Sequence, residues 1–452
     1  MMNIISMIKE VITKVFDKKS VAEKLGVTIA VSQDMTNAIR LWSDLYEGKA
    51  PWLNENVKSK RLAYAVTHEM ARLVTLEMSS GLSGGRRAEY LAPFYDKVVA
   101  DAPVFVEKAC AMGGVMLKPF ITPNGISTVY VQADSFFPTA FDSSGNITGC
   151  IFVERKIVGK RYYTRLEYHN FTAGEYTVLN KAYVSESPSD LGRSISLSSV
   201  PEWSELQEET VFTANRPLFS YFRMPGANRI DSSSPLGVSI FSDAIGAMQD
   251  ADEQYSRLLW EFEGSELAIY ADETALEHKD GKVSVPKLNK RLMRGIDQTD
   301  LYEVFSPNIR EQSILNGLDA ILRDVEYLSG LAYGTLSKQT ETAKTATEIK
   351  ASRQRSYCTV HAIQTALEHA LTDYIGVLND LCDLYKLAPS DKVEISFDFD
   401  DSLVTDAETQ QKIWLQEVAA GLMQPYEYRM RQYGETEEQA KAMLPSAFEG
   451  DE

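Results

Sequence analysis

The chain has 452 residues, and its 46 basic and 64 acidic side chains give a formal net charge of −18. Hydrophobic residues make up 44% and charged residues 24%, a globular composition that excludes wholesale disorder. The length predicts about two to four domains. The net charge excludes a protein that binds nucleic acid over its whole surface, although a local basic patch is still compatible with DNA binding.

The four cysteines are scattered without a CxxC spacing, which indicates a reducing compartment and no zinc site. No run is long and apolar enough to span a bilayer. Residues 1–16 (MMNIISMIKEVITKVF) are amphipathic, and Lys9, Glu10 and Lys14 interrupt them too early for a signal peptide. We therefore expect a soluble protein made in a cytoplasm, with no cofactor, no metal and no membrane contact.

The first third is predicted to be helical and then mixed. Apolar residues at helical spacing from Leu62 to Leu76 predict one helix, and a second helical stretch is predicted over about 88–112, closed by Gly113 and Gly114. The period then changes to two. Four β-rich segments with turns between them predict an antiparallel meander: 129–132, 147–157, 161–169 and 176–183.

A third helix is predicted over 238–262 and is strongly acidic. Between residues 236 and 266 there are seven acidic residues and one basic residue, Arg257. A helix of this length is a rod of roughly 37 Å. The next segment, 267–305, is strand-like and basic. Ser306 and Pro307 then predict the start of another helix.

A threonine-rich loop, TLSKQTETAKTATE (335–348), lies between this helix and a longer one with an apolar stripe from Val360 to Leu381. Thr345 and Glu348 fit a capping box, which marks the start of the longer helix. The central order is therefore acidic helix, basic module, helix, polar loop and long helix. Two antiparallel helices with a small module form a stalk with a knob, and a ring of copies would cover the flanks of the stalk.

Candidate catalytic motifs are weak. VEISFDFDDSLV (393–404) resembles the nucleophile motif of haloacid-dehalogenase-like phosphatases, with Asp398 as nucleophile and Asp400 as acid or base, but only about fifty residues follow it. His68 begins a zinc-protease-like helix that has Arg72 where the second histidine belongs. Gly81, Gly84 and Gly85 before two arginines favour a flexible turn over an anion cradle. The sequence predicts no enzyme.

At this point the order of parts resembles the portal proteins of tailed bacteriophages, of the type common in siphoviruses of Gram-positive hosts. The resemblance covers nearly the whole chain and is carried by six blocks: MTNAIRLWSDLYEGKAPW (35–52), HEMARLVTLEM (68–78), FFPTAFDSSGNITGCIF (136–152), PLGVSIFSDAIGAMQDADEQYSRLLWEFE (235–263), KTATEIKASRQ (344–354) and FDFDDSLVTDAE (397–408).

The resemblance implies an α+β portal fold whose C-terminal part is shorter than in larger portals. The implied parts are a mixed α/β wing (1–235), a stem helix (236–264), a small α/β clip (265–305), a second stem helix (306–333), a tunnel loop (334–345), a long channel and wing helix (346–387), a strand joining the wing sheet (388–404) and a reduced helical crown (405–452).

The resemblance also assigns three candidate surfaces. The DNA-facing tunnel loop comprises Thr335, Ser337, Lys338, Gln339, Thr340, Thr342, Lys344 and Thr345. The acidic stem, expected to line the channel, comprises Asp243, Asp250, Asp252, Glu253, Glu261 and Glu263. The partner-binding clip comprises Lys279, Lys282, Lys287, Lys290, Arg291 and Arg294.

The implied function is a twelve-fold ring at one capsid vertex, through which terminase packages double-stranded DNA without sequence preference and DNA is later ejected. The implied partners are the terminase large subunit, the major capsid and scaffolding proteins, and a head-completion adaptor that precedes the tail. The protein would be in the virion, and in the host cytoplasm during assembly. Two alternatives stay open: a phosphatase centred on Asp398 and Asp400, and a structural scaffold protein that does not act on DNA.

Overall fold

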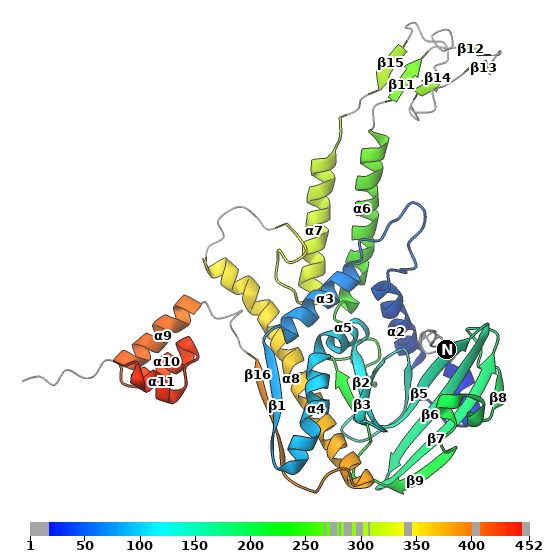
Figure 1. The fold of residues 1–452 in the computed structure, drawn as a ribbon. Helices are drawn as coiled ribbons and strands as arrows, with labels where there is room; N and C mark the ends of the chain where they lie inside the picture. The colour runs from blue at the N-terminus through cyan, green and yellow to red at the C-terminus, as the bar shows by residue number, and fades with distance from the viewer. Residues whose placement is uncertain are drawn as a thin grey trace, which may run out of the picture.

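The computed structural model describes residues 18–265, 308–338, 346–399 and 407–444, and the backbone of five short strands between residues 268 and 305. Helices and strands are both abundant and are partly segregated along the chain, so the predicted α+β class is confirmed. A broad body carries two long helices that project from it (Figure 1), and the short strands lie at the far end of those helices.

Helices dominate the first part of the body. Their bounds are α1 Lys18–Leu25, α2 Gln33–Tyr46, α3 Leu62–Thr75, α4 Arg86–Ala100 and α5 Ala102–Met112. The helical stretch predicted over about 88–112 is confirmed, and it is divided into two helices because Asp101 ends α4 and Pro103 lies in the first turn of α5. Gly113 then ends α5 at a φ of 81°, the left-handed conformation that glycine adopts most easily.

The predicted meander is confirmed for 147–157, 161–169 and 176–183, whereas the predicted segment 129–132 lies in a separate sheet. Six strands form its antiparallel sheet: β4 Phe136–Phe141, β5 Ile147–Val158, β6 Arg161–Thr172, β7 Glu175–Ser185, β8 Arg193–Ile195 and β9 Glu209–Thr213. The order is β4-β5-β6-β7-β8, and β9 pairs with the first half of β7. A smaller antiparallel sheet, in the order β10-β2-β3, contains β2 Gly114–Thr122, β3 Gly125–Gln132 and β10 Ser220–Arg223.

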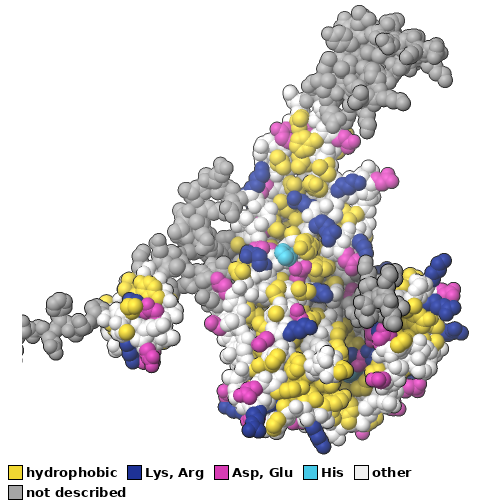
Figure 2. Space-filling view, in the orientation of Figure 1, with side chains coloured by type: hydrophobic (Ala, Val, Ile, Leu, Met, Phe, Trp, Pro, Cys, Tyr) yellow, Lys and Arg dark blue, Asp and Glu magenta, His cyan; other side chains and the backbone are white. Residues whose placement is uncertain are grey.

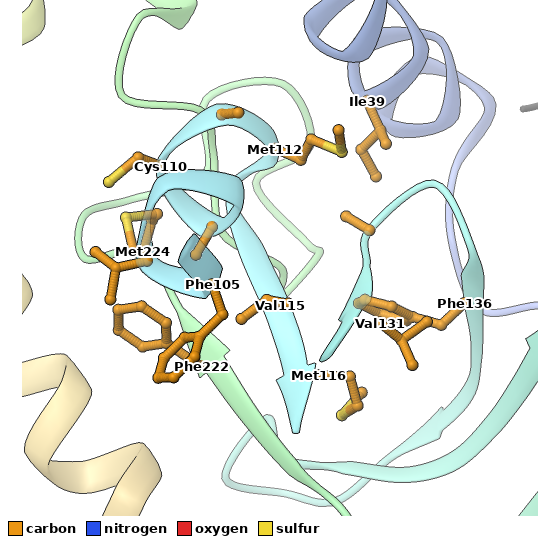
Figure 3. Packing of buried hydrophobic residues seen from close by; sticks show 14 of the residues in the cluster. Ile39, Phe105, Cys110, Met112, Val115, Met116, Val131, Phe136, Phe222 and Met224 are labelled. Carbon is orange, nitrogen blue, oxygen red and sulfur yellow. The ribbon is translucent and has the colours of Figure 1, made fainter. Parts of the chain in front are cut away.

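The main core lies where α5 covers the small sheet (Figure 3). Phe105 of α5 stacks on Tyr130 of β3 and meets Phe222 of β10 edge-on, with ring centroids 4.9 and 6.3 Å apart. The same cluster of buried side chains includes Leu367, Leu371 and Tyr374 from the long helix α8 (Ala346–Tyr385). Ser220 Oγ also donates to Ala370 O at 2.7 Å, so α8 is held against the small sheet.

The strand expected to join the wing sheet pairs with a strand from residues 1–235, but not with the meander. β16 (Val393–Phe399) pairs antiparallel with β1 (Met78–Gly84) in a two-stranded sheet of its own. Asp391, just before β16, accepts a hydrogen bond from Arg86 N at the start of α4 (2.9 Å). The flexible turn predicted at the three glycines is wrong, because Gly81 and Gly84 lie in β1 and Gly85 directly precedes α4. Three C-terminal helices lie apart from the body (Figure 1): α9 Ala407–Ala419, α10 Pro425–Tyr433 and α11 Glu437–Ala442.

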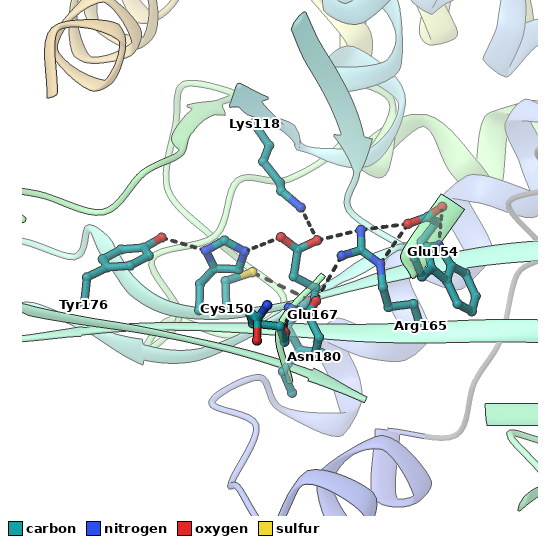
Figure 4. Close-up of polar contacts among 11 residues, drawn as sticks. Lys118, Cys150, Glu154, Arg165, Glu167, Tyr176 and Asn180 are labelled. Carbon is teal, nitrogen blue, oxygen red and sulfur yellow. Dashed lines mark hydrogen bonds and ion pairs between the residues drawn. The ribbon is translucent and has the colours of Figure 1, made fainter. Parts of the chain in front are cut away.

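A buried polar network links the two sheets (Figure 4). Glu167 of β6 accepts from Lys118 of β2, from Arg165 Nη2 at 3.0 Å and from His169 Nε2 at 2.8 Å. Burial by itself would raise the pKa of Glu167, but Lys118, Arg165 and His169 together hold the pKa well below its usual range. The carboxylate is therefore charged and compensated inside the body.

His169 is neutral in this network. Its Nε2 donates to the carboxylate of Glu167, so its Nδ1 accepts from Tyr176 OH at 2.7 Å, and that hydroxyl accepts from Leu218 N at 3.2 Å. If Nδ1 carried a proton, that proton would point at the hydroxyl hydrogen of Tyr176, and the hydrogen bond would be lost. Burial lowers the pKa of His169 below 6.5, in agreement with this tautomer.

We expect the stability of the body to depend on pH through His169. The folded protein binds this proton less readily than the unfolded chain, so the free energy of unfolding falls as pH drops below 6.5, by at most about 1.4 kcal/mol per pH unit for one proton. His169→Gln should flatten the plot of thermal midpoint against pH in that window, and His361→Gln, at an exposed histidine, should leave it unchanged. An unchanged slope in His169→Gln would assign the pH dependence to other groups.

Candidate functional site

The two projecting helices form an antiparallel pair, which we call the stem. A short 3-10 turn, η4 (Ser242–Ala244), leads into α6 (Ile245–Gly264), and α7 (Glu311–Ser329) returns to the body. Twenty residues at 1.5 Å each make α6 about 30 Å long. Both predicted helices are present. α7 begins at Glu311, and the predicted starting residues Ser306 and Pro307 lie outside the described residues.

A salt bridge closes the far end of the stem. Glu261 of α6 accepts from Arg310 Nε at 3.1 Å, from Arg310 Nη2 at 2.8 Å and from Arg310 N at 3.0 Å. These hydrogen bonds lower the pKa of Glu261, and the paired geometry fixes the two helices relative to each other. Its carboxylate is therefore committed to a contact within the chain.

A second acid joins the near end of the stem to the body. Asp252 is buried and accepts from Trp52 Nε1 at 3.0 Å and from Lys60 N at 2.6 Å. One turn later, Ser256 Oγ accepts from Lys58 N at 2.8 Å. Burial raises the pKa of Asp252. The segment between α2 and α3 is thus tied along one side of α6.

The six acids predicted to line a channel therefore divide into two groups. Asp252 and Glu261 are buried in contacts within the chain, so they do not belong to an exposed negative surface. Asp243 pairs with Arg229 at 2.5 Å and Glu253 with Arg257 at 3.8 Å, while Asp250 and Glu263 are exposed. A channel-lining role stays a prediction for these four.

The first half of the threonine loop is folded onto α7. Glu326 is 0% exposed, and its carboxylate accepts from Gly334 N (3.2 Å), Leu336 N (2.5 Å), and the backbone N (2.8 Å) and hydroxyl (2.9 Å) of Ser337. Asp319 accepts from Lys338 N at 2.7 Å. We call these contacts the loop anchor. They hold the chain from residue 334 to residue 338 against the base of the stem.

The anchor changes the predicted set of DNA-facing residues. Ser337 is 8% exposed and its hydroxyl is bonded to Glu326, so it is not presented at the surface. Thr335 and Lys338 are exposed. The other predicted residues, Gln339, Thr340, Thr342, Lys344 and Thr345, lie outside the described residues.

The chain after the loop is also fixed to the stem. α8 begins at Ala346, as the capping box predicts. The guanidinium of Arg355 lies 3.6 Å from the ring centroid of Tyr327, and its Nη2 donates to Tyr327 O at 2.7 Å. The loop is therefore held at both sides by helices that pack into the body.

The module at the far end of the stem contains β11 Ala268–Ala271, β12 His278–Lys279, β13 Lys282–Val283, β14 Leu292–Arg294 and β15 Tyr302–Phe305. β11 lies between β14 and β15, and β12 pairs with β13 so that Lys279 is opposite Lys282. Lys287, Lys290 and Arg291 lie outside the described residues, and the side chains of Lys279, Lys282 and Arg294 are likewise not described.

Large apolar side chains are exposed on the stem of the single chain. Trp260 is 66% and Phe262 is 47% exposed on α6, with Leu259 beside them, and Ile309 is exposed just before α7. Figure 2 shows hydrophobic side chains along the visible face of the stem, with acidic and basic side chains at its edges and base. Exposed apolar surface on this scale indicates a site for protein contact.

The phosphatase alternative gains no support from the fold. Asp398 is exposed on β16 of the two-stranded antiparallel sheet, and Asp400 lies outside the described residues. The described part of the chain contains no group of three or more His, Cys, Asp or Glu residues that is arranged to hold a metal ion. Nor does any helix there combine the length and apolarity needed to cross a membrane.

A mixed body, a two-helix stem with a small strand module at its end, and a loop anchored at the base of the stem define the subunit of a phage portal. The family model for the phage portal protein, SPP1 Gp6-like, matches residues 104–446, and the chain belongs to this family. It is therefore a structural component of a phage particle.

Among solved structures, the chain is similar to one in the neck of a native GTA particle computed with C12 symmetry. The identity is 12%, the match covers 92% of this chain and 98% of that one, and the TM-score is 0.45. No curated protein matches the chain.

Sequence reasoning missed the loop anchor and both contacts that hold the stem. Glu326 follows the apolar residue Val325 on the buried side of α7, where an acid needs a partner, and this was the available signal. The partners of Asp252 and Glu261 are 200 and 49 residues away in the chain, so no local pattern pointed to them.

Proposed function

We propose that this chain assembles into a closed ring that forms the portal of a phage capsid. Membership in the portal family supports the function, and the exposed apolar side chains of the stem support the ring. Trp260 and Phe262 are 66% and 47% exposed in the described chain, and a neighbouring copy on each flank of the stem would cover them. Twelve copies are the number that the resemblance to portals implies.

The proposed ring passes double-stranded DNA during packaging and ejection. Thr335 and Lys338 are exposed at the base of the stem, where the loop leaves its anchor. Hydroxyl and ammonium groups contact phosphates without reading bases, which suits a duplex that moves. Asp250 and Glu263, exposed on α6, would repel DNA from the stem and keep it sliding.

The mass of the purified full-length protein tests the ring. We expect a species of about 600 kDa by mass photometry, because twelve copies of a 50.6-kDa chain form one closed assembly, and ring views with a central channel by negative-stain microscopy. Dilution should not shift the mass gradually, since a closed ring loses two contacts with each subunit. A protein that stays near 50.6 kDa at micromolar concentration would contradict the proposal.

The proposed partners of the module at the end of the stem are the terminase large subunit during packaging and the head-completion adaptor afterwards. The support is the resemblance to portals and the basic sequence of residues 279–294. The capsid and scaffolding proteins are proposed to contact the body. Reversing the charge of Lys290, Arg291 and Arg294 should leave rings intact and reduce the yield of filled, tailed heads in the phage that encodes the chain. Reversing Lys97, Lys160 and Arg161, which are exposed on the body, is the control. Normal heads from the first variant would mean that the positive charge of the module is not needed for partner binding.

A further inference from the structure

An apolar groove lies in the body between α2 and β4. Met35 and Ile39 of α2 line one side, Phe137 and Pro138 of β4 line the other, and Val31 lies at its edge. Its empty volume is about 700 Å³ including the open mouth. The enclosed part of the groove is about 70 Å³, which holds part of one apolar side chain, and the rest of the volume is open to solvent.

The sequence that precedes the described chain has an apolar face of matching character. Ile5, Ile8, Ile12 and Val15 recur at steps of three and four residues, and Ile4, Val11 and Phe16 flank them. At 100° per residue these seven positions cover about 140° of a helical wheel, and Ser6, Lys9, Glu10, Thr13 and Lys14 occupy the opposite side. A helix of this pattern needs an apolar partner, because its isolated stability in water is marginal.

That face cannot be buried by simple extension of α1. The buried residues of α1 are Val21 and Leu25. On one continuous helix they would point about 130° away from the centre of the preceding apolar face. The two faces therefore need two different surfaces of the body.

The groove is an apolar surface beside the start of the described chain. The described chain begins at Lys18, whose Nζ donates to Val31 O, and Val31 lines the groove. The segment of 17 residues thus joins the body at the edge of the groove.

We propose that residues 1–16 dock their apolar face into this groove of the same subunit and so complete the outer wall of the body. The contact is independent of the proposed portal function. It predicts that Ile5, Ile8 and Ile12 lie within reach of Thr36, which lines the groove on α2.

Disulfide trapping in the full-length protein tests the contact. Cys358, the exposed native cysteine in the described chain, is first replaced by Ser, and Thr36→Cys is then combined in turn with Ile5→Cys, Ile8→Cys or Ile12→Cys. We expect at least one pair to form a bond within a subunit on the order of tenfold faster than the controls, since docking raises the effective concentration of the two thiols. The controls place the cysteine on the polar side, at Ser6, Lys9 or Thr13.

Digestion and mass spectrometry identify the linked peptides, and a non-reducing gel shows whether the bond is within one chain. A bond that doubles the mass would place the segment in a neighbouring subunit and overturn the proposal. Equal, slow rates in all pairs would also overturn it. Flotation with phosphatidylserine-containing vesicles, performed on wild type and Ile8→Asp, tests whether the segment binds a lipid surface instead of the groove. Vesicle binding that is lost in Ile8→Asp, together with no intrachain bond, would show this and overturn the proposal.

Discussion

Trp260→Asp should abolish ring formation and leave a folded subunit. Trp260 is 66% exposed near the far end of α6, so the single chain does not need it for its own fold. Buried at the centre of a contact between stems, an indole of this size contributes about 2 kcal/mol or more, and its loss weakens each contact roughly thirtyfold. The effect repeats at every contact around the ring, and the new carboxylate would lack a partner there. Mass photometry should therefore show single chains.

Val158→Asp is the matched control for this experiment. Val158 is exposed to a similar degree at the end of β5, away from the stem, and its replacement should leave the ring mass unchanged. Circular dichroism and thermal unfolding of both variants separate loss of assembly from loss of fold. Rings of normal mass from Trp260→Asp would mean that this part of the stem faces solvent or the channel, and the contact between copies would have to be sought on another face.

Much of the architecture could be predicted because it depends on local periodicity. The stem helices have one apolar stripe each, and the strands from Ile147 to Ser185 alternate and are separated by turn residues. The capping box at the start of α8 placed that helix to the residue. The pairing of strands that are far apart in the sequence could not be predicted. Nothing in the sequence near Val393 distinguishes β1 from the larger sheet as its partner, because a strand pattern does not specify the strand beside it.

The roles of charged residues were harder to predict for the same reason. Arg165, Glu167 and His169 alternate along β6, so all three lie on one face, and polar residues at period two are typical of a solvent-facing side. Lys118, 49 residues earlier than Glu167, covers and compensates them. Likewise a run of acids along α6 suggested one surface, whereas the structure commits Asp252 and Glu261 to Trp52 and Arg310. The sequence shows which residues are charged, but not which distant residues they contact.

Glu326→Gln should release the loop anchor while the ring still forms. The carboxylate accepts hydrogen bonds from Gly334 N, Leu336 N and both donors of Ser337. A glutamine has one acceptor oxygen, and its amide group would meet the remaining donors N–H to N–H. Each hydrogen bond lost to a charged acceptor costs about 1.5–3 kcal/mol, so a turn this short should not stay closed. The hydrogen exchange of the amides of Leu336 and Ser337 should rise sharply, with exchange in the core of α8 unchanged.

The loss of the anchor should appear in function as well as in exchange rates. If the anchored turn positions the rest of the loop toward DNA, Glu326→Gln should give rings of normal mass but heads that package or retain less of the genome. Asp324→Asn, on the exposed side of the same turn of α7, removes one charge without touching the anchor and should behave as wild type. Fast exchange at Leu336 and Ser337 combined with full-length packaged DNA would show that the anchor serves the fold alone. Slow exchange at Leu336 and Ser337 in Glu326→Gln would contradict the prediction and show that the turn closes without the charge. In that case backbone hydrogen bonds such as Leu331 N to Glu326 O would be enough to hold it.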